Sequence, residues 1–311
     1  LRYLAISFYS QQIDEERKLA IMSYYLSEDE LIQRFPNELE EVVESFRTTH
    51  PDNKEGMIIA ANFYIQRRSF EKAYLALRAY IDSGEENYPA FMQTMMLANA
   101  AGYNQELVEV SNRASEVFPD SMDIRFFRAI ALYELESFPE IIENFRGLDW
   151  NDFGNREYQS QSRMLLAEAY YRTGDFIASD SAFEALLDDE PENYTVLNNF
   201  SYYLAERGER LDEALVWSRK AVEQNPENAT FIDTYAWVLF QMGKYEDAEK
   251  AILEALEKGG NNDPEINEHA GDIQKALESY QVAGSYYEKA IMLGGDEQRL
   301  RKKLEDLREM P

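Results

Sequence analysis

The sequence predicts an all-α fold in which one pair of helices is repeated along the chain. Small residues recur at a fixed spacing: Ala214 and Ala248 are 34 residues apart, as are Ala221 and Ala255. Apolar residues between them follow the three-to-four-residue spacing of helices, and Gly or Pro interrupts each run. A period between about 20 and 50 residues is typical of stacked repeats, so an array of helical hairpins is expected.

The same register can be followed through most of the 311 residues. Residues 1–53 match this repeat register poorly, and we expect divergent helical repeats there. Residues 298–311 place Leu300, Leu304 and Leu307 on one helix face, which predicts a capping helix over the last repeat. Between them, an array over 54–297 is expected, with approximate units 54–87, 88–121, 122–159, 160–193, 194–228, 229–263 and 264–297.

One stretch, "DTYAWVLFQMGKYEDAEKAILEALEKGG" (233–260), shows the repeat most clearly. Ala236 and Ala248 are small where two antiparallel helices would cross, and Gly243 would end the first helix. With Tyr245 and Ile252 at the seam to neighbouring units, this pattern resembles the tetratricopeptide repeat (TPR) family. The resemblance implies a right-handed α-α superhelix (a TPR solenoid) of about seven to eight repeats, whose first helices line a concave groove.

In that family, positions 2, 5, 9, 12 and 13 of each unit face the groove. In this chain, those positions are mostly apolar, which suits the docking of an extended or helical peptide. Packing of some of these side chains against neighbouring helices is the alternative. The candidate partner-binding residues are Met92, Met96, Phe126, Ile130, Tyr133, Met164, Tyr171, Tyr202, Trp237 and Phe240.

Toward the C-terminus the same positions become acidic, with Asp233, Glu268 and Asp272. Acidic side chains there would repel the terminal carboxylate that some TPR modules clamp, so an apolar or basic segment is the favoured ligand. The whole chain has 31 Lys and Arg against 59 Asp and Glu, a net charge of −28. Such a chain repels phosphate backbones, and nucleic-acid binding is not expected.

No motif for chemistry is evident. The chain lacks Cys, its two histidines, His50 and His269, lie among carboxylates, and we expect both to be surface residues. Residues 147–159 resemble a calcium loop, but Ser160 stands where a bidentate Glu is needed. We therefore expect no enzyme activity, no cofactor and no metal site, although a solenoid that holds a small ligand is an alternative.

The sequence begins at Leu1, inside an apparent helix and without Met, so we expect an upstream portion that could carry an export signal or membrane anchor. The last hundred residues resemble those of bacterial envelope TPR lipoproteins, some of which deliver substrates to a carboxy-terminal processing protease. This resemblance favours a bacterial periplasm, with the cytoplasm as alternative. The expected function is protein binding as an adaptor or scaffold; the alternative is a structural subunit of an envelope assembly that uses its convex faces.

Overall fold

A computed structural model describes residues 2–10 and 12–310 of the chain, and every regular element in this part is a helix. The predicted all-α fold of stacked helix pairs is therefore confirmed. The chain divides into two compact units, Leu1–Ala169 and Tyr170–Pro311. The boundary falls inside one helix, α11.

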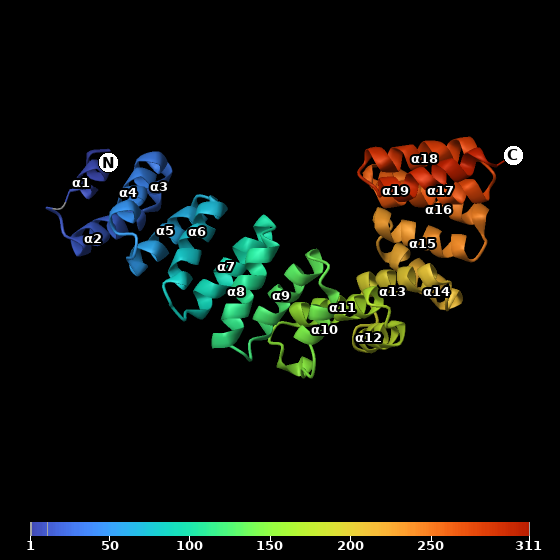
Figure 1. Ribbon diagram of the computed structural model, residues 1–311, viewed down its shortest axis with the longest axis horizontal. Coiled ribbons are helices and arrows are strands. Elements are labelled where there is room, and N and C mark those ends of the chain that lie inside the picture. The colour runs from blue at the N-terminus through green and yellow to red at the C-terminus, as the bar shows by residue number, and fades with distance from the viewer. Residues whose placement is uncertain (1, 11, 311) are drawn as a thin grey trace. The chain divides into compact units, whose positions relative to one another are not determined.

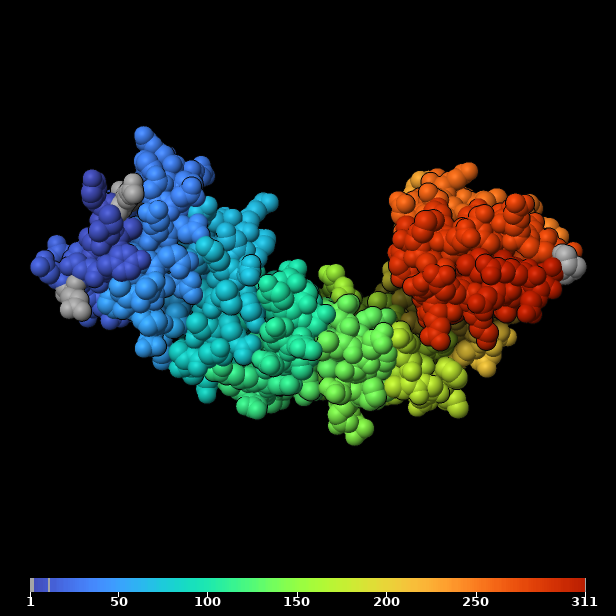
Figure 2. Space-filling view, turned by 45° about the horizontal axis from the view of Figure 1, so that its top comes forward, coloured from blue at the N-terminus to red at the C-terminus, as the bar shows by residue number. Residues whose placement is uncertain are grey.

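The first unit contains α1 (Arg2–Phe8), α2 (Glu15–Leu26), α3 (Asp29–Arg34), α4 (Pro36–Thr49), α5 (Lys54–Gln66), α6 (Phe70–Asp82), α7 (Tyr88–Ala101), α8 (Asn104–Val117), α9 (Met122–Glu134), α10 (Phe138–Asn144), η1 (Trp150–Asp152) and most of α11 (Arg156–Arg172). The second contains α12 (Phe176–Asp189), α13 (Tyr194–Arg207), α14 (Leu211–Gln224), α15 (Ala229–Gln241), α16 (Tyr245–Glu257), η2 (Gly260–Asn262), α17 (Pro264–Ala276), α18 (Tyr280–Met292) and α19 (Glu297–Arg308). Within each unit, successive helices pack next to one another in chain order (Figure 1, Figure 2).

Each repeat is an antiparallel hairpin of a first helix, termed the A helix, and a second, the B helix. The A helices include α5, α7, α9, α13, α15 and α17, and each contacts the B helix that follows it. In the hairpin of α15 and α16, the side chains of Ala236 and Ala248 are both fully buried. Only small side chains allow such close helix crossing, which explains why alanines recur at this spacing.

Helix ends are set by local side chains. Asn53, Asn87, Asn193 and Asn228 each cap the N-terminus of an A helix by accepting hydrogen bonds from its first-turn amides. Gly243 lies in the turn between α15 and α16 with φ of +73°, a conformation that glycine adopts without strain. Other A–B turns use Arg68, Glu136 and Glu278 in the same left-handed region, so the turn geometry persists without glycine.

Gly271 shows how tightly the last complete hairpin is packed. It lies in α17, and a Cβ atom at this position would be 2.3 Å from Cε1 of Tyr287 in α18. We expect Gly271→Ala to destabilise the second unit by about 1–3 kcal/mol, because the buried Tyr287 ring would have to move. Urea unfolding followed by circular dichroism measures this change.

Gly284 in α18 provides the matched control. A Cβ there would lie 3.7 Å from the nearest atom, in Leu304, which is an ordinary contact. Gly284→Ala should therefore stabilise the unit slightly, by up to about 1 kcal/mol, through helix propensity. Equal effects of the two substitutions would contradict the packing described for α17 and α18.

The A helices of each unit lie along one common side. In the second unit, α15 contacts both α13 and α17, and in the first unit α7 contacts α9. The surface that these helices share is called the A-helix face of each unit below. Within residues 2–10 and 12–310, none of the helices combines the length and apolar character needed to span a bilayer.

Candidate functional site: the A-helix faces of the two units

The A-helix face of the first unit carries apolar side chains that solvent can reach. Met92 and Met96 stand one turn apart on α7, with Met92 half-buried and Met96 51% exposed. Ile130 and Tyr133 of α9 are half-buried, and Tyr133 packs edge-on against Phe138. Since α7 and α9 are in contact, these side chains form a strip across two neighbouring helices.

Phe126 differs from this group, although the sequence placed it among the candidate contacts. Its side chain is only 3% exposed and stacks on Tyr158 of α11, with ring centroids 4.1 Å apart. A buried ring cannot supply much contact area to a partner, so Phe126 is a packing residue between A helices. Met164, on α11, is half-buried.

In the second unit, the predicted residues are held by neighbouring side chains. Tyr171 is half-buried, with its ring centroid 4.2 Å from that of Tyr203. Trp237 is 8% exposed and lies between His269 and Phe240, with centroid separations of 4.1 Å and 4.8 Å. The prediction of Trp237 as a direct contact is therefore at odds with its burial, whereas Tyr202 and Phe240 remain partly accessible.

His269 corrects the expectation of a surface histidine. It is buried on α17, and its Nδ1 lies 2.9 Å from Oδ1 and 3.0 Å from Oδ2 of Asp233, which is also buried. Burial alone would lower the pKa of His269, but the Asp233 carboxylate, with Glu265 and Asp272 nearby, raises that pKa to about 9. The pair is therefore a charged imidazolium and carboxylate at neutral pH.

The other acidic residues expected to line this face are also neutralised. Glu268 is buried and pairs with Arg299 (2.7 Å) and Lys303 (2.8 Å), both from α19. Asp272 pairs with Lys303 at 2.5 Å and accepts a hydrogen bond from the Tyr287 hydroxyl. The expectation that these acids face a ligand is therefore wrong, because Arg299 and Lys303 of α19 already neutralise them.

Two carboxylates that the sequence analysis did not single out are accessible instead. Glu206 of α13 accepts a hydrogen bond from Nε1 of Trp237 (2.7 Å), and Glu265 of α17 accepts one from the Tyr202 hydroxyl (2.6 Å). Both glutamates are exposed. They stand at positions 13 and 2 of their repeats, so the family pattern alone was a sufficient signal for them.

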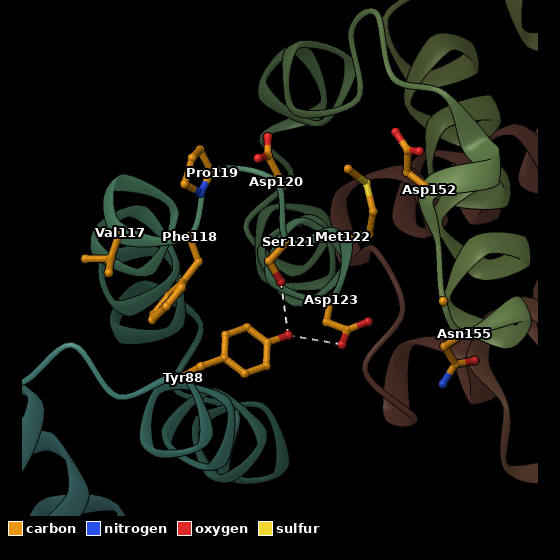
Figure 3. A pocket seen from close by; sticks show the side chains of 11 residues that line it. Tyr88, Val117, Phe118, Pro119, Asp120, Ser121, Met122, Asp123, Asp152 and Asn155 are labelled. Atoms are coloured by element: carbon orange, nitrogen blue, oxygen red, sulfur yellow. Dashed lines mark hydrogen bonds between the residues drawn. The ribbon is translucent and has the colours of Figure 1, made fainter.

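A surface pocket of the first unit begins at Tyr88 of α7, and its lining does not include Met92 or Met96. It is formed by the segment that joins α8 to α9 and the segment before α11, and Asn155 lies across it from Tyr88 (Figure 3). The Tyr88 hydroxyl donates to Asp123 (3.2 Å) and shares a hydrogen bond with Ser121 (3.1 Å). Throughout the described residues, no three His, Cys, Asp or Glu side chains are grouped closely enough to hold a metal ion.

Comparison with known families decides what these hairpins are. Two models described as tetratricopeptide repeat match residues 164–229 and 203–268, which include α13 and α15 with Tyr202 and Trp237. Residues 164–268 of this chain are tetratricopeptide repeats. TPR proteins are generally protein-interaction modules, and their fold is typically not that of an enzyme.

Related proteins agree with this assignment. The TPR repeat-containing protein PA4667 of Pseudomonas aeruginosa is 26% identical over 224 residues, which cover 68% of this chain and 36% of the relative. The chain thus spans about a third of that protein's length.

Solved structures share the fold. A TPR protein from Parabacteroides merdae superposes with a TM-score of 0.67 at 16% identity, over 82% of this chain and 99% of that one. The APC/C hetero-tetramer Cut9–Hcn1 gives a TM-score of 0.62 at 10% identity, over 98% of this chain and 62% of the other. At such low identities these similarities concern the fold alone.

Proposed function

We propose that this TPR protein is an adaptor or scaffold that binds a partner polypeptide on its A-helix faces. The observation that carries the proposal is the strip on the first unit formed by Met92 and Met96 of α7 and Ile130 and Tyr133 of α9. Accessible methionines adapt to different apolar partners, and a strip across two helices accommodates the apolar side of a helical peptide. The net charge of −28 adds a preference for partners that are not acidic.

Paired substitutions on an A helix and on the neighbouring B helix test this assignment. Met96 of the A helix α7 and Leu75 of the B helix α6 are both 51% exposed, so glutamate at either position disturbs the fold little and to a similar extent. We expect Met96→Glu to weaken binding of amphipathic peptides by at least about tenfold, which corresponds to about 1.4 kcal/mol. Fluorescence anisotropy with uncharged amphipathic peptides, selected first on an array, measures the affinity.

Leu75→Glu should leave the same affinity unchanged within about twofold, since α6 is a B helix. Loss of binding in Leu75→Glu but not in Met96→Glu would contradict the proposal and place the working surface on the B helices.

A second candidate function is that of a structural subunit that contacts an assembly through its B helices. The observation in its favour is a set of exposed apolar residues on these helices, of which Ile177 of α12 (84%) and Met292 of α18 (78%) are the most exposed. Single exposed apolar residues are common on protein surfaces, which is why this function ranks second. It predicts that Ile177→Glu, and not Met96→Glu, reduces association in sedimentation experiments.

A further inference from the structure

We propose that the A-helix face of the second unit contains a subsite for one basic side chain of the partner, formed by Glu206, Tyr202 and Glu265. This inference rests on the proposed function, because it names the chemistry of the polypeptide that is bound. Arginine fits the subsite best, and lysine is the weaker alternative.

The three residues converge from helices that are distant in sequence. Tyr202 and Glu206 stand one turn apart on α13, and Glu265 lies in the first turn of α17. The Tyr202 hydroxyl donates to Glu265, 63 residues away, while Trp237 of the intervening helix α15 donates to Glu206. Helices α13 and α17 both contact α15, so these hydrogen bonds fix the two carboxylates on one surface.

Within the described part of the chain, Glu206 and Glu265 lack a Lys or Arg partner, although the buried His269 lies close enough to Glu265 for the two to interact electrostatically. Both are exposed, and among the described residues neither forms an ion pair with a Lys or Arg; their hydrogen bonds come from neutral donors. The buried acids of the same face differ, since Asp233 is paired with His269 and Glu268 with cations of α19. Among the described residues, Glu206 and Glu265 thus form no ion pair with Lys or Arg and are open to solvent and to a partner.

A second feature independently indicates a missing donor. Asn198 precedes Tyr202 by one turn on α13, which places both on the same helix face. Asn198 is only 4% exposed, and its Oδ1 atom has no hydrogen-bond donor, although its Nδ2 donates to Asn199 at 3.2 Å. A buried acceptor without a donor is rare, and basic side chains carry only donors.

The chemistry of the subsite favours guanidinium. Arg can present separate N–H groups to two carboxylates and lie against an aromatic ring such as that of Tyr202, whereas Lys acts as a point charge. Burial and the surrounding carboxylates of Glu265, Glu206 and Asp233 raise the pKa of Tyr202. Its hydroxyl therefore stays protonated and continues to donate to Glu265 while the cation binds.

The test compares three amphipathic peptides that share the same apolar residues and carry Arg, Gln or Glu at the flanking positions. We expect the Arg peptide to bind the wild-type chain at least tenfold more tightly than the Gln peptide. Glu206→Gln combined with Glu265→Gln should abolish this preference and leave affinity for the Gln peptide unchanged. Glutamine keeps an acceptor for Trp237 and for Tyr202, so the local structure is retained.

A control of equal net charge separates the subsite from general attraction to an acidic protein. Glu223→Gln with Glu246→Gln changes two exposed glutamates on the B helices α14 and α16, and should preserve the Arg preference. The subsite would be overturned if both double variants lost the Arg preference equally, or if the variant with Glu206→Gln and Glu265→Gln kept it. Peptide binding itself would still stand in either case. If none of the three peptides binds, the proposed function fails and the subsite with it.

Discussion

Ala236→Glu is expected to unfold most of the second unit. Ala236 is fully buried where α15 crosses α16, opposite Ala248, and no space exists for a longer side chain. A glutamate would place an uncompensated charge in the core of Ile232, Ile252 and Ile273 in addition to separating the helices. We expect these two effects together to lower the free energy of unfolding by more than about 4 kcal/mol. Urea unfolding followed by circular dichroism measures this change.

Ala185→Glu is the control for this substitution, because Ala185 is an exposed residue of α12 in the same unit. It should change the free energy of unfolding by less than about 1 kcal/mol. If Ala236→Glu and the parent chain had the same midpoint of unfolding, the repeat register that places Ala236 in the helix crossing would be wrong.

Asp233→Asn is expected to remove the charge of the buried pair at nearly constant volume. Folding raises the pKa of His269 from its ordinary 6.5 to about 9. The resulting stabilisation is complete below pH 6.5 and is lost as pH rises through 9; at about 1.4 kcal/mol per pH unit it amounts to about 3 kcal/mol. Asp233→Asn should therefore lower stability by about this amount at pH 6.

The pH dependence distinguishes charge loss from general damage. Stability of the parent chain should fall between pH 7 and 9.5, whereas the variant should lack this decline, because its buried His269 is neutral over that range. The two curves should approach each other near pH 10. A constant difference between parent and variant from pH 6 to pH 10 would show that His269 is not charged in the folded protein.

The repeat architecture could be predicted from sequence because its determinants are local and periodic. Ala236 and Ala248 are conspicuous as small residues in otherwise large apolar runs, and the structure places both in the helix crossing. The turns were less evident. Glu136 and Glu278 adopt the left-handed conformation that Gly243 adopts elsewhere, and nothing in their residue type indicates it.

The site was predicted less well, since burial on the A-helix faces depends on which neighbouring helix supplies a partner. Phe126 is covered by Tyr158, and His269 by Trp237 and Asp233, from helices 32 or more residues away in sequence. Likewise, Glu268 and Asp272 were expected to line the groove because they are acidic, but α19 supplies the cations that pair with them. The accessible acids Glu206 and Glu265 could have been found from their repeat positions alone.

Hydrogen–deuterium exchange with and without saturating Arg-flanked amphipathic peptide tests most directly whether the A-helix faces bind polypeptides. We expect slower exchange in α7 and α9 of the first unit or α13 and α17 of the second, with the B helices α6, α8, α14 and α16 unaffected. Protection confined to those B helices, or no protection at saturation, would contradict this expectation.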